Sequence, residues 1–297
     1  MNTKTKGILN GAIASASYGT NPLFALPLFA AGIGVNSVLF YRYAFAVVIY
    51  GLWITFIKKI SLKISIREII PLFILAILFS FSSLTLFDAF NYIEAGIACT
   101  ILFIYPIMVA IIMAIFFKEK ITKTTIGAIL LTSIGILALY NGKPGTTLSI
   151  HGIIVVLLSA LLYALYIVGV KNIKILNNIN QDKMSFYIMF FGLLVYICNL
   201  KFCTQLQMLN RPILWLYTIG LSIFPTIISL ETINVAIKLI GSTSTAILGA
   251  LEPLTAIFFG VVIFHQHLTL RISLGITLIL LGVLLIITKN TRLKKEL

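Results

Sequence analysis

Four ionisable side chains lie within long apolar stretches of this sequence, namely Arg42, Asp88, Glu231 and Glu252. An ionisable group inside a bilayer costs roughly 2.5–3.5 kcal/mol on insertion scales, so such residues point to function if their stretches cross a membrane. An arginine there could bind a carboxylate or a phosphate through its planar set of donors. Alternatively, its guanidinium could extend to the membrane interface, beside the aromatic residues that flank it in the sequence.

Glu231 is predicted to face the interior of a helical bundle. Asn234 follows it by three residues and Lys238 by seven, so helical periodicity places Glu231 and Lys238 on one face. The Glu231 carboxylate could carry a proton or bind the ammonium group of a substrate, or it could stabilise the bundle through a hydrogen bond alone. Asp88 allows the same functions, but it lies near the outer edge of its stretch, where water reaches a carboxylate at little cost.

Two proline-containing stretches form the strongest candidate site. Glu252 precedes Pro253, and Tyr105 precedes Pro106 at the equivalent place in the other half of the chain. Proline removes one helical hydrogen bond, so both helices should kink near the middle of the membrane. Two such kinks beside a cavity would turn Tyr105 and Glu252 toward each other. The alternative is that both stretches serve helix packing.

Aromatic and amide side chains could line the same cavity. Tyr18 and Asn21 are one helical turn apart, and Tyr163 and Tyr166 occupy the corresponding positions 145 residues later. A few polar groups among aromatic rings suit a small amphipathic substrate, although buried tyrosines also pack in bundles with a single hydrogen bond. Pro22 would allow the first helix to bend.

Composition indicates the elements that must position these residues. The 297 residues are 60% hydrophobic and 10% charged, with a mean hydropathy of +1.10, whereas soluble domains are roughly 45–50% apolar and about 25% charged. About 20 apolar residues cross a bilayer, so the sequence predicts an all-α polytopic membrane protein without a soluble domain. Its ten predicted spans are 7–29, 36–57, 69–90, 94–117, 124–141, 150–170, 184–200, 212–235, 240–264 and 271–288.

Basic residues predict the orientation of these spans. If the N-terminus lies inside, the inside segments hold 17 of the 22 basic residues and the outside loops hold four, while Arg42 lies within a span. Because lysine and arginine mark cytoplasmic loops, we expect both termini inside and a multi-pass protein of the cytoplasmic (inner) membrane. The net charge of +14 then reflects those loops and not a nucleic-acid partner. The first apolar stretch continues too far for a signal peptide, so we expect it to be retained as a helix.

The two halves of the chain, 1–145 and 146–297, resemble each other. Gly7 and Tyr18 align with Gly152 and Tyr163, and a second set aligns 147 residues apart: Ile93, Pro106, Phe117, Thr122, Gly135 and Leu137 with Ile240, Pro253, Phe264, Thr269, Gly282 and Leu284. A duplicated unit of five helices must enter the membrane from opposite sides, which predicts an inverted repeat. Inverted repeats are typical of alternating access, with the site near the midplane.

Several motifs resemble a known family. They are Ala89 to Gly96 running to Tyr105-Pro106, Lys118 to Thr122 with the helix that follows, Ala236 to Ser242, and Leu251-Glu252-Pro253. Over nearly its whole length the chain is similar to the EamA-type ten-helix members of the drug/metabolite transporter superfamily. The acidic residue that usually follows the proline helix is Glu119 in the first copy but Gln266 in the second. The resemblance implies a monomer or weak homodimer that moves small metabolites, often exporting amino acids, and a structural or gating ion pair for Arg42.

Other functions have less support. The sequence contains no aspartate-rich stretch for metal-diphosphate binding, and its three cysteines have neither disulfide nor metal-ligand spacing, so an intramembrane enzyme is disfavoured and no cofactor or metal is expected. A channel, or an importer or exchanger of nucleotide sugars or vitamins, remains open. The working hypothesis is a secondary transporter that exports a small amino-acid-like or amphipathic metabolite. Proton coupling, exchange and uniport are all compatible with the sequence.

Overall fold

The computed structural model describes residues 2–93, 95–139, 149–262 and 270–292, and these are helical throughout apart from connecting turns and loops. Glu94 and Gln266 lie outside the described residues. The first half contains α1 (Thr3–Tyr18), α2 (Asn21–Ala30), α3 (Val35–Leu52), the π-helical turn η1 (Trp53–Ile57), α4 (Ile66–Ala89), α5 (Ala95–Leu102), α6 (Tyr105–Phe117) and α7 (Lys123–Leu139). The second contains α8 (Ile150–Asn172), the 3-10 turn η2 (Lys174–Asn178), α9 (Gln181–Asn199), α10 (Pro212–Ser222), the π-helical turn η3 (Ile223–Ile228), α11 (Ser229–Ile240), α12 (Ser242–Leu248), α13 (Leu251–Val262) and α14 (Leu270–Arg292).

These elements form ten helical segments at the ten predicted spans, because α1–α2, α3–η1, α5–α6, α10–η3–α11 and α12–α13 each form one segment. Four of the segments are long and apolar enough to cross a membrane unaided: Val35–Ile57, Ile66–Ala89, Ile150–Asn172 and Pro212–Ile240. Large apolar side chains such as Phe56 and Ile115 are exposed on the outside of the bundle. Such a surface would be costly in water but matches a bilayer.

Three of the segments break close to the molecule's interior, and each break directly precedes a proline-containing turn. Gly19 and Thr20 separate α1 from α2, and Gly249 and Ala250 separate α12 from α13. At these breaks the backbone tightens to hydrogen bonds three residues apart, such as Gly249 N to Ala246 O at 3.1 Å. The third break lies between α5 and α6, just before Tyr105.

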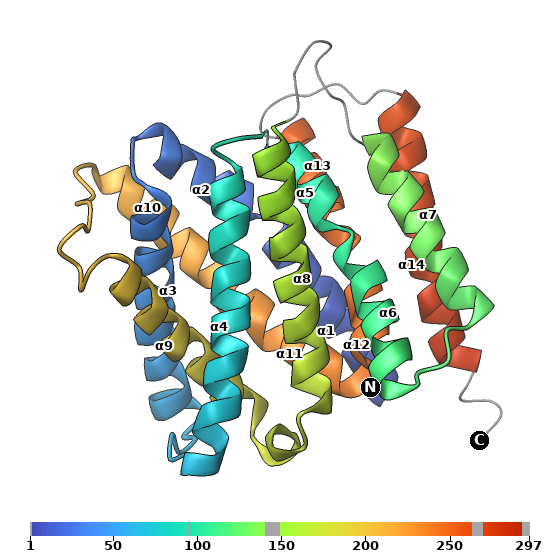
Figure 1. The fold of residues 1–297 in the computed structure, drawn as a ribbon, viewed down its shortest axis with the longest axis horizontal. Helices are drawn as coiled ribbons and strands as arrows, with labels where there is room; N and C mark the ends of the chain where they lie inside the picture. Colours follow the sequence, from blue (N-terminus) through green and yellow to red (C-terminus); the bar gives the residue numbers. More distant parts are fainter. Residues whose placement is uncertain (1, 94, 140–148, 263–269, 293–297) are drawn as a thin grey trace.

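The helices pair in a pattern that repeats between the two halves (Figure 1). In the centre α1 packs on α11 and α13, and α8 packs in the same way on α4 and α6. The last helix of each half, α7 and α14, pack on each other to one side. α1 starts at the end of the molecule where the N-terminus lies, whereas α8 starts at the opposite end (Figure 1). This arrangement fits a duplicated unit whose two copies run in opposite directions.

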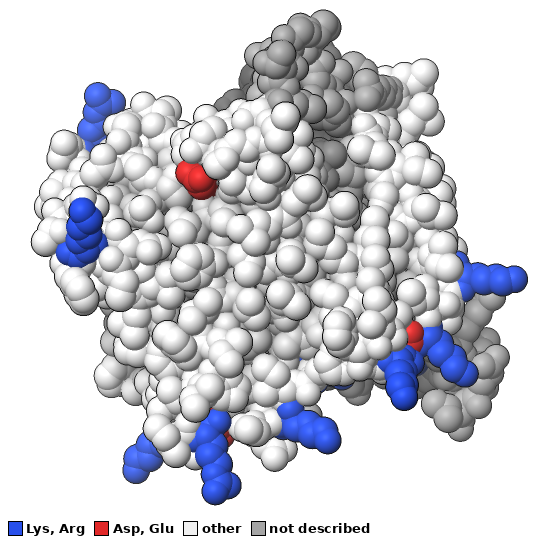
Figure 2. Space-filling model, in the orientation of Figure 1, with Lys and Arg blue, Asp and Glu red and all other residues white. Residues whose placement is uncertain are grey.

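On the outer surface, charged side chains gather at the two ends of the bundle. Figure 2 shows basic residues gathered mainly at the end near both termini, a few at the other end, and a wide band without charge between them. The basic end is the one that the sequence predicts to face the cytoplasm. The uncharged band corresponds to the exposed apolar side chains of the helices.

Candidate functional site

A cluster of buried tyrosines occupies the centre, where the two halves meet. Tyr163 of α8 lies at the middle of the cluster, with its ring 4.8 Å from that of Tyr105 of α6 in an edge-on contact. Its ring is also stacked at 6.0 Å on Tyr18 of α1 and at 6.2 Å on Tyr166. All four are buried. The structure therefore brings together the four tyrosines that the sequence singles out, from both repeats.

Glu252 borders this cluster at the start of α13. Its Oε1 lies 3.5 Å from the Tyr105 hydroxyl, so the two residues expected to face each other are in contact. A cavity of about 30 Å³ opens beside them. Its lining comes from both halves and consists of Tyr18, Gly19, Asn21, Pro22, Leu86, Phe90, Cys99, Leu102, Phe103, Glu252 and Pro253.

Two glycines permit this close approach of helices. A methyl group on Gly249 would collide with the Tyr105 hydroxyl, and one on Gly19 would collide with the backbone carbonyl of Glu252. Both glycines lie at helix breaks. The two repeats therefore approach each other closely at both of these interruptions of the backbone.

Arg42 is completely buried in α3, so its guanidinium does not extend to the interface as the alternative interpretation supposed. Its Nε donates to Thr226 Oγ1 at 2.5 Å and its Nη2 to the Pro225 carbonyl at 3.0 Å. The guanidinium carbon also lies 5.5 Å from the centre of the Phe87 ring. Within the described part of the chain, no carboxylate forms an ion pair with Arg42, and its Nη1 has no hydrogen-bond partner.

Further buried polar atoms near Arg42 and Tyr18 also lack partners in the described ranges. They are both amide atoms of Asn21, the Tyr43 hydroxyl and the hydroxyls of Ser80 and Ser83. Asn21 lines the cavity beside Glu252, and the Tyr43 ring centre lies 5.7 Å from the Arg42 guanidinium carbon, so the interior around these residues is polar. Because buried polar groups are nearly always hydrogen-bonded, this interior is suited to bind water or a polar ligand.

Tyr166 and Asn234 differ from these residues because their polar groups are already paired. The Tyr166 hydroxyl donates to Asn234 Oδ1 at 2.5 Å, and Asn234 Nδ2 donates to Ser185 Oγ at 2.9 Å. This buried chain joins α8, α9 and α11. The pairing favours a structural role for both residues over direct contact with a ligand.

Comparisons with known proteins decide the family. The sequence matches the EamA-like transporter family twice, over residues 5–141 and 150–288. The chain belongs to this family. It is therefore a multi-pass membrane transporter and not an enzyme, and the two matches correspond to the two repeats.

Similar proteins add little about what this transporter carries. It is 28% identical over 192 residues to an uncharacterized transporter of Archaeoglobus fulgidus, covering 65% of this chain and 67% of the relative. The fold is also similar to the crystal structure of another protein, with a TM-score of 0.75 and 15% sequence identity. The alignment covers 98% of this chain and 99% of the chain in that crystal structure. That likeness shows the fold alone. In the described parts of the transporter, no group of three or more His, Cys, Asp or Glu residues could hold a metal ion.

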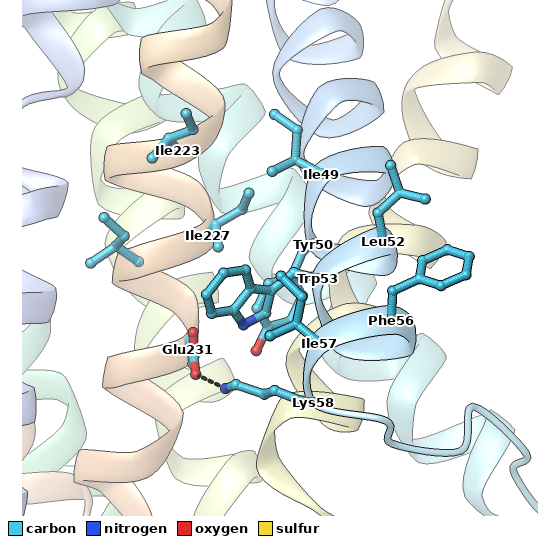
Figure 3. Close-up of a pocket in the computed structure, with 11 residues that line it drawn as sticks. Ile49, Tyr50, Leu52, Trp53, Phe56, Ile57, Lys58, Ile223, Ile227 and Glu231 are labelled. Carbon is cyan, nitrogen blue, oxygen red and sulfur yellow. Dashed lines mark hydrogen bonds and ion pairs between the residues drawn. The ribbon is translucent and has the colours of Figure 1, made fainter.

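Two predicted site residues lie away from the centre of the transporter. Asp88 is the second-last residue of α4, and its Oδ1 accepts a weak hydrogen bond of 3.4 Å from Asn91. Glu231 lies on α11 and accepts from Lys58 Nζ at 2.7 Å (Figure 3). Lys238 does not pair with Glu231, because its Nζ donates to the carbonyls of Leu176 and Ile179.

The ion cluster of Lys58, Asp182 and Glu231 was missed by the sequence analysis. Lys58 also binds Asp182 Oδ1 at 2.7 Å, and the Tyr50 hydroxyl donates to the same oxygen at 3.2 Å. Partial burial opposes the charged forms, but the hydrogen bonds of the cluster outweigh it: they raise the pKa of Lys58 and, through Lys58, lower that of Asp182. The sequence did contain one signal for this cluster. Asp182 is an acidic residue in a predicted cytoplasmic segment that is otherwise rich in lysine.

Proposed function

We propose that this transporter exports an amino acid, or a closely related amphipathic zwitterion, by alternating access. One observation carries the proposal: within the described residues, Arg42 from the first repeat is fully buried and Glu252 from the second lines the central cavity, and neither forms an ion pair. A buried ion is costly unless it is paired and hydrogen-bonded. A zwitterion supplies a counter-charge to each of them at once.

The unpaired atoms indicate how such a cargo would bind. Its carboxylate would accept from Arg42 Nη1, the one guanidinium nitrogen without a protein partner in the described residues. Its ammonium would bind Glu252, whose carboxylate accepts one long hydrogen bond, of 3.5 Å from the Tyr105 hydroxyl, within the described residues. The tyrosine rings between them could pack against an apolar side chain and attract the ammonium through their faces.

The small cavity means that the cargo site must widen before it is filled. A volume of about 30 Å³ has room for about one or two water molecules. The helix break beside Gly19 borders this cavity, and the break beside Gly249 directly precedes the segment that contains Glu252. Both breaks could act as hinges while the two repeats rock around the cavity. We therefore interpret the described conformation as a closed state.

Direction and coupling follow from the same residues. The basic end with both termini supports an orientation with that end in the cytoplasm of a cell whose inner membrane holds the protein. Because a proton and the cargo ammonium would compete for the Glu252 carboxylate, proton entry would release the cargo on the outer side. The proposed coupling is thus proton antiport through Glu252.

The test is a mass-spectrometric profile of the medium around cells that overproduce the transporter. It is compared with cells that hold Glu252→Gln at equal membrane abundance and with cells lacking both. An amino acid or related zwitterion that accumulates only with the parent would support the proposal. Equal accumulation with both proteins would overturn the role of Glu252, and no accumulation with either would overturn export.

A further inference from the structure

A long groove on the side of the bundle lies apart from the central site (Figure 3). It has a volume of about 740 Å³ and runs between α3–η1 of the first half and η3–α11 of the second. Its walls are almost entirely apolar. They consist of Ile49, Leu52, Trp53, Phe56, Ile57, Ile223, Ile227 and Ile228, with Tyr50, Lys58 and Glu231 as the polar members.

Two polar contacts hold the walls of this groove together. Arg42 binds the Pro225 carbonyl and Thr226 of η3, and Lys58 binds Glu231 of α11, five residues after Thr226. Each wall also contains a π-helical turn, η1 on one side and η3 on the other. Such turns occur frequently at functional sites because they widen a helix locally. The groove is thus a built feature between two fixed contacts.

The open side of the groove faces outward from the bundle. Phe56 is 70% exposed and Ile57 63% exposed, and Leu52 and Trp53 are also exposed. These side chains lie at the end of an apolar segment that is long enough to cross a membrane. In a bilayer the groove therefore opens onto lipid tails, which are the apolar molecules available to fill it.

The polar end of the groove has two carboxylates but one ammonium group in the ion cluster. Lys58 Nζ binds one oxygen of Asp182 and one of Glu231, both at 2.7 Å, so two carboxylates share one ammonium. The three side chains are 20–28% exposed, which leaves the cluster accessible at its rim. In the described part of the chain, Lys58 is the one cation that forms an ion pair with these two carboxylates. The cluster therefore has one net negative charge and can accept a second ammonium.

We propose that the groove binds one phospholipid with a primary ammonium headgroup. Its acyl chain would lie between the apolar walls, and its ammonium would donate to the carboxylates of Glu231 and Asp182. The level of the cluster suits this assignment, because Lys58 directly follows the apolar segment, where lipid headgroups meet the protein. This inference concerns a site outside the central cavity and does not depend on the identity of the cargo.

The test uses purified full-length transporter with two lipids of identical acyl chains, phosphatidylethanolamine and phosphatidylcholine. The choline headgroup is also positive but has no N–H to donate. Binding is measured by native mass spectrometry as the fraction of protein that retains one lipid. The ethanolamine lipid should bind the parent about tenfold more tightly, since a hydrogen bond to a charged group contributes about that factor.

Three variants separate this site from nonspecific binding. Glu231→Gln should abolish the preference for the ethanolamine lipid, whereas Glu119→Gln, which changes an exposed acid away from the groove, should keep it. Ile227→Trp fills the apolar part and should weaken both lipids, which tests the acyl-chain site even if Glu231→Gln does not fold. Each variant is first checked for a single folded species by size-exclusion chromatography.

Several results would overturn the proposal. Equal binding of the two lipids by the parent would exclude recognition of an ammonium with N–H donors. Stronger binding of phosphatidylglycerol than of the ethanolamine lipid would mean that the surrounding lysines dominate. Efficient disulfide cross-linking of Phe56→Cys between two copies in a bilayer, without any lipid preference, would assign the groove to a dimer interface.

Discussion

Arg42 Nε and Thr226 Oγ1 are 2.5 Å apart across the boundary between the two repeats. The Thr226 hydroxyl accepts this bond and donates its own proton to the Leu221 carbonyl five residues back, at 2.8 Å. That spacing belongs to the π-helical turn η3, which also presents the Pro225 carbonyl to Arg42. The turn thus fixes two of the guanidinium nitrogens, while the third, Nη1, has no partner in the described residues.

We expect Thr226→Val to impair recognition of a carboxylate by loosening Arg42. Valine has nearly the same shape as threonine but cannot accept from Nε, and a hydrogen bond to a charged group contributes about 1.5–3 kcal/mol. The KM for an exported zwitterion should rise at least about tenfold, with a smaller change in kcat, in transport assays with proteoliposomes. Thr232→Val is the matched control, because the Thr232 hydroxyl bonds only carbonyls of its own helical segment. An equal rise in KM for both variants would contradict the positioning role.

The contact between Gly249 and Tyr105 gives a prediction about stability. Gly249→Ala places a methyl group onto the Tyr105 hydroxyl, and overpacking of a core costs about 1–3 kcal/mol. Adding Tyr105→Phe removes the hydroxyl and should restore part of the lost stability, although the methyl group would still be 2.7 Å from the ring carbon Cζ. Thermal unfolding in detergent of the parent, both single variants and the double variant measures this coupling. If the double variant lost more stability than the two single variants lose together, the helices would not meet here.

Helical periodicity predicts which residues share a face but not which helix packs against that face. The ten spans follow from apolar runs, and the structure has them. The 145-residue offset singles out Tyr18 and Tyr163 as equivalent positions, but their stacking on each other is a finding of the structure. The partner of Glu231 is different, since Lys58 lies 173 positions away and approaches only because η1 packs beside η3–α11. The partners of Arg42 could not be predicted for the same reason. They are an uncharged hydroxyl and a backbone carbonyl, which the sequence does not mark as partners of an arginine.

The ion cluster predicts a dependence of stability on pH at the acid end. The pKa of Asp182 is lowered from its ordinary value of 3.8 in the folded protein, mainly by Lys58 acting against burial. Its contribution to stability is therefore fully present above pH 3.8 and is lost as the pH falls through the lower folded value. The difference in Tm between the parent and Asp182→Asn should be constant near neutral pH and should shrink below pH 3.8. A difference that stays unchanged down to the lowest pH at which the parent folds would exclude this ion pair as its source.

Lys58 sets the alkaline limit of the same cluster. Its hydrogen bonds to Asp182 and Glu231 outweigh burial and raise its pKa above the ordinary 10.5. The stabilisation is thus fully present below pH 10.5 and is lost as the pH rises through the folded value. Lys58→Met, which keeps much of the apolar stem, should differ from the parent in Tm at pH 8, and the difference should decrease above pH 10.5. A difference that grows with alkaline pH would reverse the sign and contradict the assignment.

Gln207 closes the bundle at the end opposite to the ion cluster, and it does so without charge. Its side chain accepts from the Gly34 N–H and donates to the Gly32 carbonyl at 3.3 Å. Its backbone N–H donates to Ser37 Oγ at 3.1 Å, while its carbonyl accepts from the Tyr41 hydroxyl at 3.0 Å. One end of the transporter is therefore held by a partly exposed ion cluster, and the other by hydrogen bonds around one glutamine.

Breaking the two closures should open the interior from opposite sides. Cys99 lines the small cavity beside Glu252, so it can report access once Cys198 and Cys203 are replaced by serine. Labelling of Cys99 by a charged maleimide is measured in oriented proteoliposomes. Gln207→Ala should accelerate labelling when the reagent is added on the side of residues 32–41. Glu231→Gln should accelerate labelling when the reagent is added on the side of Lys58. Gln205→Ala, on the same exposed loop, is the control for the first variant. If both variants accelerated labelling from the same side, the two ends would not act as separate gates. Alternating access around the central cavity would then lose its support.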